Sequence, residues 1–425
     1  MDLSRRRILK AALLAAAAGA TAGCASTGSG ARSGSPTGDL TLWYWGGGLS
    51  DKVVADAAKH FPGDGLTSAQ IGGAFKQKLL VTMIANKYVP DITGVKGEDM
   101  PYFLPDADHF IDLNTLGARK LAPQFLSWKW KQGTTEDGRL IGFPIDIGPT
   151  ALYYRADLFA KAGLPSDPAA VAAAAPTLDD YFALGAELRK ALPKSFLVNN
   201  IGSIFTLRLG QLTKRFIDQD NRFIGDQDHI REAWTTAVKP FRLGIDAGIN
   251  DSSWNAAIGN GTLTTEVGAA WHAADIEQAA PNTKGRWRVA PTPGGPANNG
   301  GSFLALPKSC RNPELAFQMI TWMLDAANQG RNFTDAQVFP TMPAAYALPA
   351  LTAPDPYFGG QRTIDIFGPA AKNIPFAYTA PADNAVSAPY YSELTNIEAI
   401  GKDPDAAWRD AVQSARLIAE QQGVN

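Results

Sequence analysis

Hydrophobic residues along the chain form short runs typical of β-strands, separated by stretches in which they recur at the spacing of one helix face. The run 40–45 (LTLWYW) is β-type and ends at three consecutive glycines. A helical stripe over 75–88 follows, and then a short strand over 90–95. This order of strand, helix and strand favours parallel strands covered by helices, which is an α/β fold.

Further elements continue this alternation to the end of the chain. Helices are predicted from a cap at Ser50 to His60 and over 157–163, 181–192, 229–248, 315–324 and 408–421. Strands are predicted over 151–154, 268–272, 286–290 and 303–306. The Ala/Pro-rich stretch 167–176 is expected to be a surface insertion.

The first 24 residues have the form of an export signal. The sequence 4–10 (SRRRILK) resembles the twin-arginine signal, and the apolar stretch 11–22 behind it is shorter than the about 20 residues that span a membrane. Residues 21–24 (TAGC) resemble a bacterial lipobox, which implies cleavage before Cys24 and a diacylglycerol on its thiol. A plain signal peptide is the alternative, because a threonine stands where the lipobox usually has an aliphatic residue.

Composition places the rest of the chain among globular proteins of more than one domain. The chain has 425 residues, of which 45% are hydrophobic and 19% charged. Removal of residues 1–23 takes away four basic residues and one acidic residue, which leaves 35 basic and 40 acidic residues and a net charge of −5. This charge argues against a nucleic-acid partner. The Gly/Ser/Thr-rich stretch 24–38 is typical of a flexible tether.

Candidate chemistry is sparse. If Cys24 is lipidated, Cys310 has no disulfide partner and is expected to be a structural thiol, and the four histidines lack the spacing of metal ligands. The sequence contains no phosphate loop, zinc-protease motif or nucleophile elbow. The acidic stretch 218–228 lacks the glycine and the final glutamate of a calcium loop. We therefore predict no catalytic residue, metal or cofactor, although the widely spaced carboxylates of a glycoside hydrolase stay open.

Four ordered segments resemble the extracellular solute-binding proteins of bacterial ABC sugar importers, the maltose-binding-protein-like group. They are 40–48, 89–92 (VPDI), 142–164, which contains FPIDIGP and YYRADLF, and 291–316. The third is the most specific, and the set covers most of the chain behind the signal. The resemblance implies a two-lobed, periplasmic-binding-protein-like fold of type II, in which the ligand lies in the cleft and closure is a hinge motion.

The positions of these segments give the expected domain boundaries. The first lobe comprises 39–146 and 302–354, and the second comprises 147–301 and 355–425. The chain is expected to cross between the lobes near 146–150, 301–303 and 354–360. Prolines in the first and third of these segments limit backbone freedom there, which suits a hinge confined to few residues.

The candidate ligand residues of the first lobe suit a sugar, whose apolar CH face stacks on aromatic rings and whose hydroxyl rim bonds polar groups. Ligands of open α/β sheets bind beyond the strand ends, which favours Trp45 and Gly47. Only one of the two tryptophans of the first strand is expected to face the cleft, so Trp43 is assigned to the core. Glu98 and Asp99 follow the strand 90–95, where the family places polar contacts; solvated loop carboxylates are the alternative.

The remaining candidates lie at the crossings and in the second lobe. Asp146 stands between two prolines, and Trp271 matches the stacking tryptophan of the family, with a core position as the alternative. Gly301 and Ser302 precede a strand and are expected to let the backbone approach the ligand. The exposed-looking turn 357–362 offers an aromatic ring, an amide and a guanidinium, from Tyr357, Gln361 and Arg362; a surface role is the alternative.

The resemblance thus implies a monomeric, lipid-anchored, extracytoplasmic protein that captures a sugar, a di- or oligosaccharide, and delivers it to the permease of an ABC importer. It implies no enzyme activity. Two alternatives stay open. The same fold with a glycerophosphodiester or other polar ligand predicts a cleft richer in Lys and Arg than in Trp, and an exported glycoside hydrolase predicts turnover of oligosaccharide.

Overall fold

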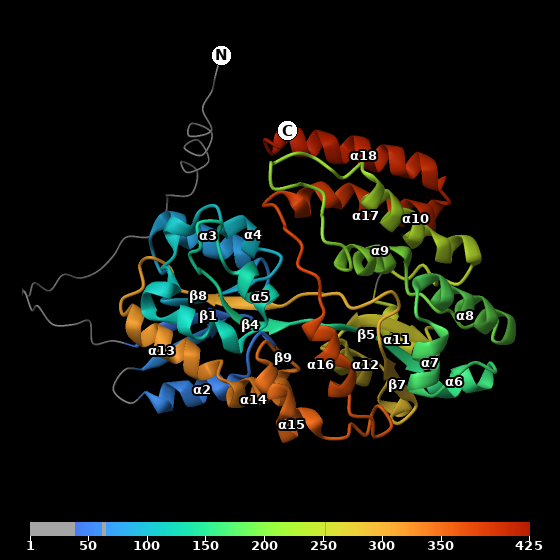
Figure 1. Ribbon diagram of the computed structural model, residues 1–425, viewed down its shortest axis with the longest axis horizontal. Helices are drawn as coiled ribbons and strands as arrows, with labels where there is room; N and C mark the ends of the chain where they lie inside the picture. Colours follow the sequence, from blue (N-terminus) through green and yellow to red (C-terminus); the bar gives the residue numbers. More distant parts are fainter. Residues whose placement is uncertain (1–38, 62–64, 251) are drawn as a thin grey trace, which may run out of the picture. The chain divides into compact units, whose positions relative to one another are not determined.

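Two β-sheets surrounded by helices organise the chain (Figure 1). The computed structural model describes residues 39–61, 65–250 and 252–425. The export signal, Cys24 and the tether lie outside the described residues, so the interpretations placed on them stay predictions. No helix within the described ranges is long and apolar enough to cross a membrane.

The larger sheet has its strands in the order β2-β1-β3-β8-β4-β9. Strand β1 is parallel to β2 and β3, whereas β8 runs antiparallel to β3 and β4. The position of β8 brings a late segment of the chain back into the sheet that its first residues began. The bounds are β1 Leu40–Tyr44, β2 Leu66–Gln70, β3 Ile92–Lys96, β4 Phe143–Ile147, β8 Ser302–Ala305 and β9 Phe339–Pro340.

The smaller sheet contains β6 (Thr265–Ala269), β5 (Thr150–Arg155) and β7 (Trp287–Ala290), with β5 in the middle and antiparallel to both neighbours. All of β5 is buried, and its side chains alternate between two hydrophobic cores. Tyr154 belongs to a core built on the helices of the second lobe. Tyr153 belongs to another core that also contains Phe339 of β9, so the two sheets share apolar packing.

The predicted helices are present, with shifts of their ends. Ser50 caps α2 by accepting a hydrogen bond from the backbone N–H of Val53, as predicted. The helix expected over 229–248 ends earlier because Gly244 takes a left-handed φ of +64°. The bounds are α2 Asp51–His60, α3 Phe75–Ala85, α4 Met100–Phe103, α5 Ser127–Gln132, α6 Ala156–Lys161, α7 Pro168–Ala174, α8 Leu178–Ala191, α9 Ile201–Gly210, α10 Asp228–Leu243, α11 Trp254–Asn260, α12 His272–Ala279, α13 Pro313–Met323, α14 Ala326–Ala336, α15 Pro349–Thr352, α16 Ile364–Lys372, α17 Asp383–Ile400 and α18 Pro404–Gln421.

Two segments differ from the sequence-based prediction. The Ala/Pro-rich stretch contains α7, which the Asp167 side chain caps and whose Val171 is fully buried, so it is part of the packed second lobe and not a surface insertion. The strand expected over 268–272 ends at Ala269, and α12 begins at His272. The residues that follow Trp271 are mostly strong helix formers, which explains the early end of the strand.

A buried carboxylate, Asp91, ties the start of β3 to β1 and to the loop after β8. Its Oδ2 accepts hydrogen bonds from the backbone N–H and the hydroxyl of Thr41 at 2.8 and 2.9 Å, and its Oδ1 accepts from the backbone N–H and the Nε of Arg311 at 3.0 and 3.1 Å. Burial acts to raise the pKa of Asp91, but the hydrogen bonds from Arg311 and Thr41 outweigh it and hold the pKa below its ordinary value. The carboxylate therefore stabilises the fold above the ordinary pKa of aspartate, and this contribution is lost as the pH falls through the lowered value.

Replacement of Asp91 by asparagine is expected to lower the free energy of unfolding by about 1–2 kcal/mol at pH 7. The asparagine NH2 group is itself a donor, and it would face the donors of Thr41 or Arg311 in place of an accepting oxygen. The loss is expected to shrink as the pH falls below about 4, because the unfolded chain then takes up a proton at Asp91 and the wild type loses the contribution of its carboxylate. Urea unfolding followed by circular dichroism at pH 7 and about pH 3 measures both effects. Asp39→Asn is the control, since Asp39 is an exposed carboxylate beside the same strand; equal losses in the two variants would contradict the role of Asp91.

Candidate functional site

Two segments that link the sheets run side by side at the centre of the site. The chain leaves β4 and enters β5 through 148–149, and it returns from β7 to β8 through 291–301; the first two predicted crossings are 146–150 and 301–303. The backbone N–H of Thr150 donates to the carbonyl of Ala297 at 3.0 Å, and the N–H of Asn299 donates to the carbonyl of Gly148 at 2.9 Å. These bonds hold the two crossings together. The predicted third crossing, 354–360, lies between α15, which packs on α14, and α16, which packs on β5.

Two glycines permit this close approach. A Cβ on Gly148 would lie 1.8 Å from the carbonyl oxygen of Asn299, closer than any real contact. Gly301 has a φ of +87°, and a Cβ there would meet the carbonyl oxygen of Asp146 at 2.7 Å and the Lys129 Nζ at 2.9 Å. Gly301 is thus needed both for its conformation and for the space beside the lysine.

The first-lobe tryptophans lie on one face of the chain, because residues two apart in a strand point the same way. Trp43 and Trp45 are both partly buried and pack on the same hydrophobic core, so the assignment of Trp43 to the core and of Trp45 to the ligand stays a prediction. The Trp45 ring covers Gly94 of β3, where a Cβ would lie 2.7 Å from it, and the Lys96 Nζ stands 5.6 Å from the ring centroid. Gly47 is exposed, with a φ of +79°.

The two loop carboxylates after β3 have different surroundings. Glu98 is exposed, and its backbone carbonyl accepts a hydrogen bond from the Asn384 Nδ2 at 3.0 Å. Asp99 is paired with Lys76 at 3.2 Å. The N–H of Gly97 donates to the carbonyl of Gly301 at 2.7 Å, so this loop touches the second crossing directly.

Asp146 faces Ser302 and a buried lysine across the sheet. The Ser302 hydroxyl donates to the Asp146 Oδ1. The Lys129 side chain is fully buried, its Nζ has no hydrogen-bond partner, and it stands 3.7 Å from the Phe303 ring centroid. Burial lowers the pKa of Lys129 to about 7 against the opposing pull of Asp146 and Glu98. Burial also raises the pKa of Asp146, although Lys129 and the Ser302 hydrogen bond act against it.

Sequence reasoning missed Lys129. The available signal is its position between Trp128 and Trp130, the two apolar residues of a short helix that is otherwise polar. The Trp128 Nε1 donates to the carbonyl of Ala371 at 2.9 Å, which fixes the orientation of α5. A lysine in such a segment is solvated only if it points away from the core, and the packing of α5 turns it inward.

Trp271 reaches the second crossing from the other sheet. Ala269 and Ala270 before it are buried, whereas Trp271 is partly exposed, which argues against the alternative of a core position. Its Nε1 donates to the carbonyl of Asn299 at 3.4 Å, and its ring packs on His272 with centroids 4.0 Å apart. A Cβ on Gly300 would lie 3.6 Å from this Nε1, so the indole stands next to Gly300.

The turn 357–362 does not join this group, which corrects the expectation that it is an exposed binding element. Tyr357 is buried, and its hydroxyl donates to the carbonyl of Ala280 at 2.8 Å. The Gln361 amide accepts a hydrogen bond from the N–H of Val289 and donates one to its carbonyl, so it satisfies both backbone groups of this residue at the edge of β7. Arg362 is exposed and forms an ion pair with Asp365 at 3.4 Å. The sequence 357–362 (YFGGQR) joins aromatic, glycine and polar residues, and this composition does not indicate which side chains pack into the core.

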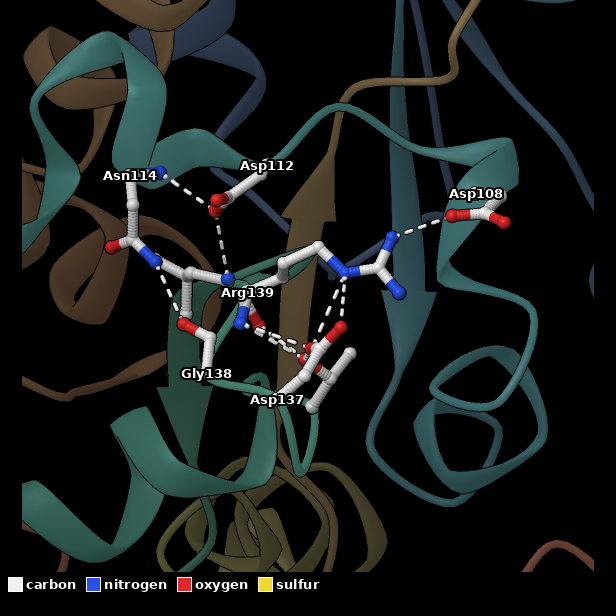
Figure 2. Close-up of polar contacts among 8 residues, drawn as sticks. Asp108, Asp112, Asn114, Asp137, Gly138 and Arg139 are labelled. Atoms are coloured by element: carbon white, nitrogen blue, oxygen red, sulfur yellow. Dashed lines mark hydrogen bonds and ion pairs between the residues drawn. The ribbon is translucent and has the colours of Figure 1, made fainter.

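A cavity of about 580 Å³ lies beside Gly97, between the first-lobe segments 131–139 and the segment 376–381 before α17. Its lining includes none of the eleven predicted ligand residues. Arg139 holds the rim by donating to Asp137 at 2.9 Å and to Asp108 at 2.6 Å, and Asp112 accepts from the N–H groups of Asn114 and Leu140 at 3.0 Å each (Figure 2). These hydrogen bonds fix the conformation of the turn that forms the rim of the cavity.

Redox and metal chemistry find no support among the described residues. Cys310 is buried, and burial raises its thiol pKa to about 11, which leaves the thiol protonated and unreactive at neutral pH. No group of three or more His, Cys, Asp or Glu side chains in the described ranges has the geometry of a metal site.

Comparison with known proteins gives consistent matches over most of the chain. Residues 44–358 match the family described as bacterial extracellular solute-binding protein. The arabinooligosaccharide-binding protein of Bacillus subtilis (strain 168) is 26% identical over 330 residues, which cover 71% of this chain and 72% of that protein. A solved extracellular solute-binding protein of family 1 is 28% identical with a TM-score of 0.85, over 90% of this chain and 99% of that one. The sugar-binding protein MalE from Xanthomonas citri is 18% identical with a TM-score of 0.77, over 91% and 98% of the two chains, a likeness of fold.

Proposed function

The chain belongs to the bacterial extracellular solute-binding protein family, and we propose that it captures a sugar beside the two crossings and delivers it to the permease of an ABC importer. The match confirms the family inferred from the sequence, and the likeness to MalE confirms the two-lobed α/β fold. A di- or oligosaccharide is the proposed ligand, because one relative carries the name of an arabinooligosaccharide-binding protein.

The observation that carries this proposal is the convergence of predicted residues around the hydrogen bond between Gly97 and Gly301. Trp271 stands beside Gly300 from the second lobe, and Glu98 follows Gly97 from the first. Lys96, which precedes Gly97, pairs with Ser302 across the sheet and lies over the Trp45 ring. Aromatic faces and hydrogen-bonding groups from both lobes therefore surround one point, as recognition of a sugar requires.

The charges at this point balance, which favours an uncharged ligand. Three carboxylates and three ammonium groups belong to the group: Glu98, Asp99 and Asp146, with Lys76, Lys96 and Lys129. A phosphodiester would need a net positive surrounding. The three lysines outnumber the two tryptophans, as the alternative of a glycerophosphodiester ligand predicts, but the three carboxylates offset their charge, and that alternative is therefore the weaker one.

Calorimetric titration of the protein with arabino-, malto- and galacto-oligosaccharides and with glycerophosphocholine tests the proposal. We expect saturable one-to-one binding of at least one oligosaccharide and none of glycerophosphocholine. Mass spectrometry of the oligosaccharide after long incubation is expected to recover it intact. The absence of binding to every oligosaccharide would contradict the sugar assignment, and shortened products would favour a glycoside hydrolase.

The cellular setting follows from the same proposal. An extracellular solute-binding protein works outside the cytoplasm, and Cys24 is the proposed point of lipid attachment, with 24–38 as the tether. We propose that the protein acts as a monomer and without catalysis, and that Trp45, Gly47, Glu98, Asp99, Asp146, Trp271, Gly301 and Ser302 form its ligand contacts.

A further inference from the structure

A second polar pocket, of about 430 Å³, opens in the second lobe next to Trp271. Its walls come from three elements: Glu266 on β6, His272 and Asp275 on α12, and Trp254 at the start of α11. Asn199, before α9, closes one side, and two exposed amides line the mouth. The His272 ring packs on Trp271, so the pocket adjoins the proposed sugar site without being part of it.

Two buried polar atoms of this pocket lack partners. The Asn199 Oδ1 and the His272 Nδ1 are shielded from solvent and form no hydrogen bond. Burial lowers the pKa of His272 to about 4, so the ring is neutral at pH 7. An unsatisfied buried polar atom destabilises a fold, and a ligand that hydrogen-bonds to it removes this cost.

The pocket is acidic: its lining contains two carboxyl groups, no lysine and no arginine, and its one histidine, His272, is neutral at pH 7. Glu266 is buried, and the Trp254 Nε1 donates to its Oε2 at 3.1 Å. Burial raises the pKa of Glu266 to about 7, and the nearby charge of Asp275 acts in the same direction. Two carboxyl groups in a partly buried space without a counter-charge favour the binding of a cationic ligand group. A neutral hydroxyl group would leave the negative charge of the two carboxylates without a positive partner.

We propose that this pocket is a subsite for an amine-bearing sugar unit, with the ammonium group bound between Glu266 and Asp275 and the ring against Trp254. The proposal rests on the sugar-binding function and narrows its ligand class. A phosphorylated or carboxylated sugar unit would be repelled by the like charge of the two carboxylates. An N-acetylated sugar unit has no ammonium group, so it lacks the charge that Glu266 and Asp275 would recognise.

Calorimetry with glucosamine and N-acetylglucosamine at pH 7 tests the subsite. We expect the amine form to bind about tenfold more tightly, as a charge-assisted hydrogen bond supplies about one factor of ten. Binding is also expected to release protons, since an ammonium group drives Glu266 to ionise, and titration in buffers of different ionisation enthalpy measures this release. Glu266→Gln, which keeps an acceptor for Trp254, is expected to abolish both the preference and the proton release.

Controls separate this subsite from the sugar site itself. Asp275→Asn is a second test variant and is expected to weaken the preference, while Glu277→Gln on the exposed side of α12 is expected to leave it intact. Equal affinity for the two sugars, or an unchanged preference in both test variants, would overturn the subsite even if neutral oligosaccharides bind. Failure of every neutral oligosaccharide to bind, with the amine preference present, would instead overturn the proposed function alone.

Discussion

The Trp271→Ala variant is expected to bind the sugar ligand about 30-fold more weakly than the wild type. A stacked tryptophan at a binding site typically carries about 2 kcal/mol, and each 1.4 kcal/mol is a factor of ten. Trp271 is partly exposed and makes a single long hydrogen bond, at 3.4 Å, so its removal costs the fold little. The loss is therefore expected in the dissociation constant and not in the unfolding temperature.

Titration calorimetry with the oligosaccharide that the wild type binds most tightly measures this effect. Trp322→Ala is the matched control, because Trp322 is also partly buried but stacks on His60 at the surface of the first lobe. We expect the control to retain wild-type affinity. Unchanged affinity in Trp271→Ala would contradict the stacking role and favour a small polar ligand that needs no aromatic face.

The fold was largely predictable because it depends on local patterns. The β-type run at 40–45 and the apolar stripe at 75–88 each signal their element within a few residues, and β1 and α3 formed there. The glycines and prolines at 142–149 indicated a change in the chain's path for the same reason, since the conformational preferences of glycine and proline belong to single residues, and β4 ends and β5 begins there. Helix ends were less accurate, because Gly244 ends α10 through its own conformation and not through the hydrophobic period.

The site was only partly predictable because its contacts join distant segments. Asp146 meets Ser302 through the antiparallel pairing of β4 and β8, and no local pattern records that pairing. The prediction for Tyr357 failed for a different reason. The composition of its turn is typical of an exposed loop, but the Tyr357 side chain is buried and its hydroxyl donates to the carbonyl of Ala280. Lys129 was missed because lysine is normally solvated, and its burial depends on the packing of α5 against α16.

Replacement of Lys129 by methionine is expected to stabilise the protein by about 2 kcal/mol at pH 6. The pKa of Lys129 is lowered by burial from 10.5 to about 7, and each pKa unit corresponds to about 1.4 kcal/mol, so below pH 7 the buried ammonium costs roughly 5 kcal/mol. Methionine removes this cost with a similar volume. Part of the gain is offset, because Asp146 then loses the favourable charge of Lys129.

The stability difference between Lys129→Met and the wild type is expected to depend on pH. Below pH 7 the lysine is protonated in both the folded and the unfolded state, so its full cost is present. Between pH 7 and 10.5 the unfolded chain still binds the proton that the folded state has lost, so the wild type gains stability as the pH rises. The advantage of Lys129→Met is thus expected to be largest at pH 6 and to diminish by pH 9.

Denaturant unfolding of both proteins at pH 6 and pH 9 measures this difference, with Lys120→Met as the control because Lys120 is exposed. We expect the control to follow the wild type at both pH values. A variant less stable than the wild type at pH 6 would mean that Asp146 holds the ammonium in a net stabilising pair. In that case Lys129, which lies beside Gly301, would stabilise the contact between the two crossing segments. The expected result would instead mean that Lys129 lowers the stability of the fold next to the proposed ligand site.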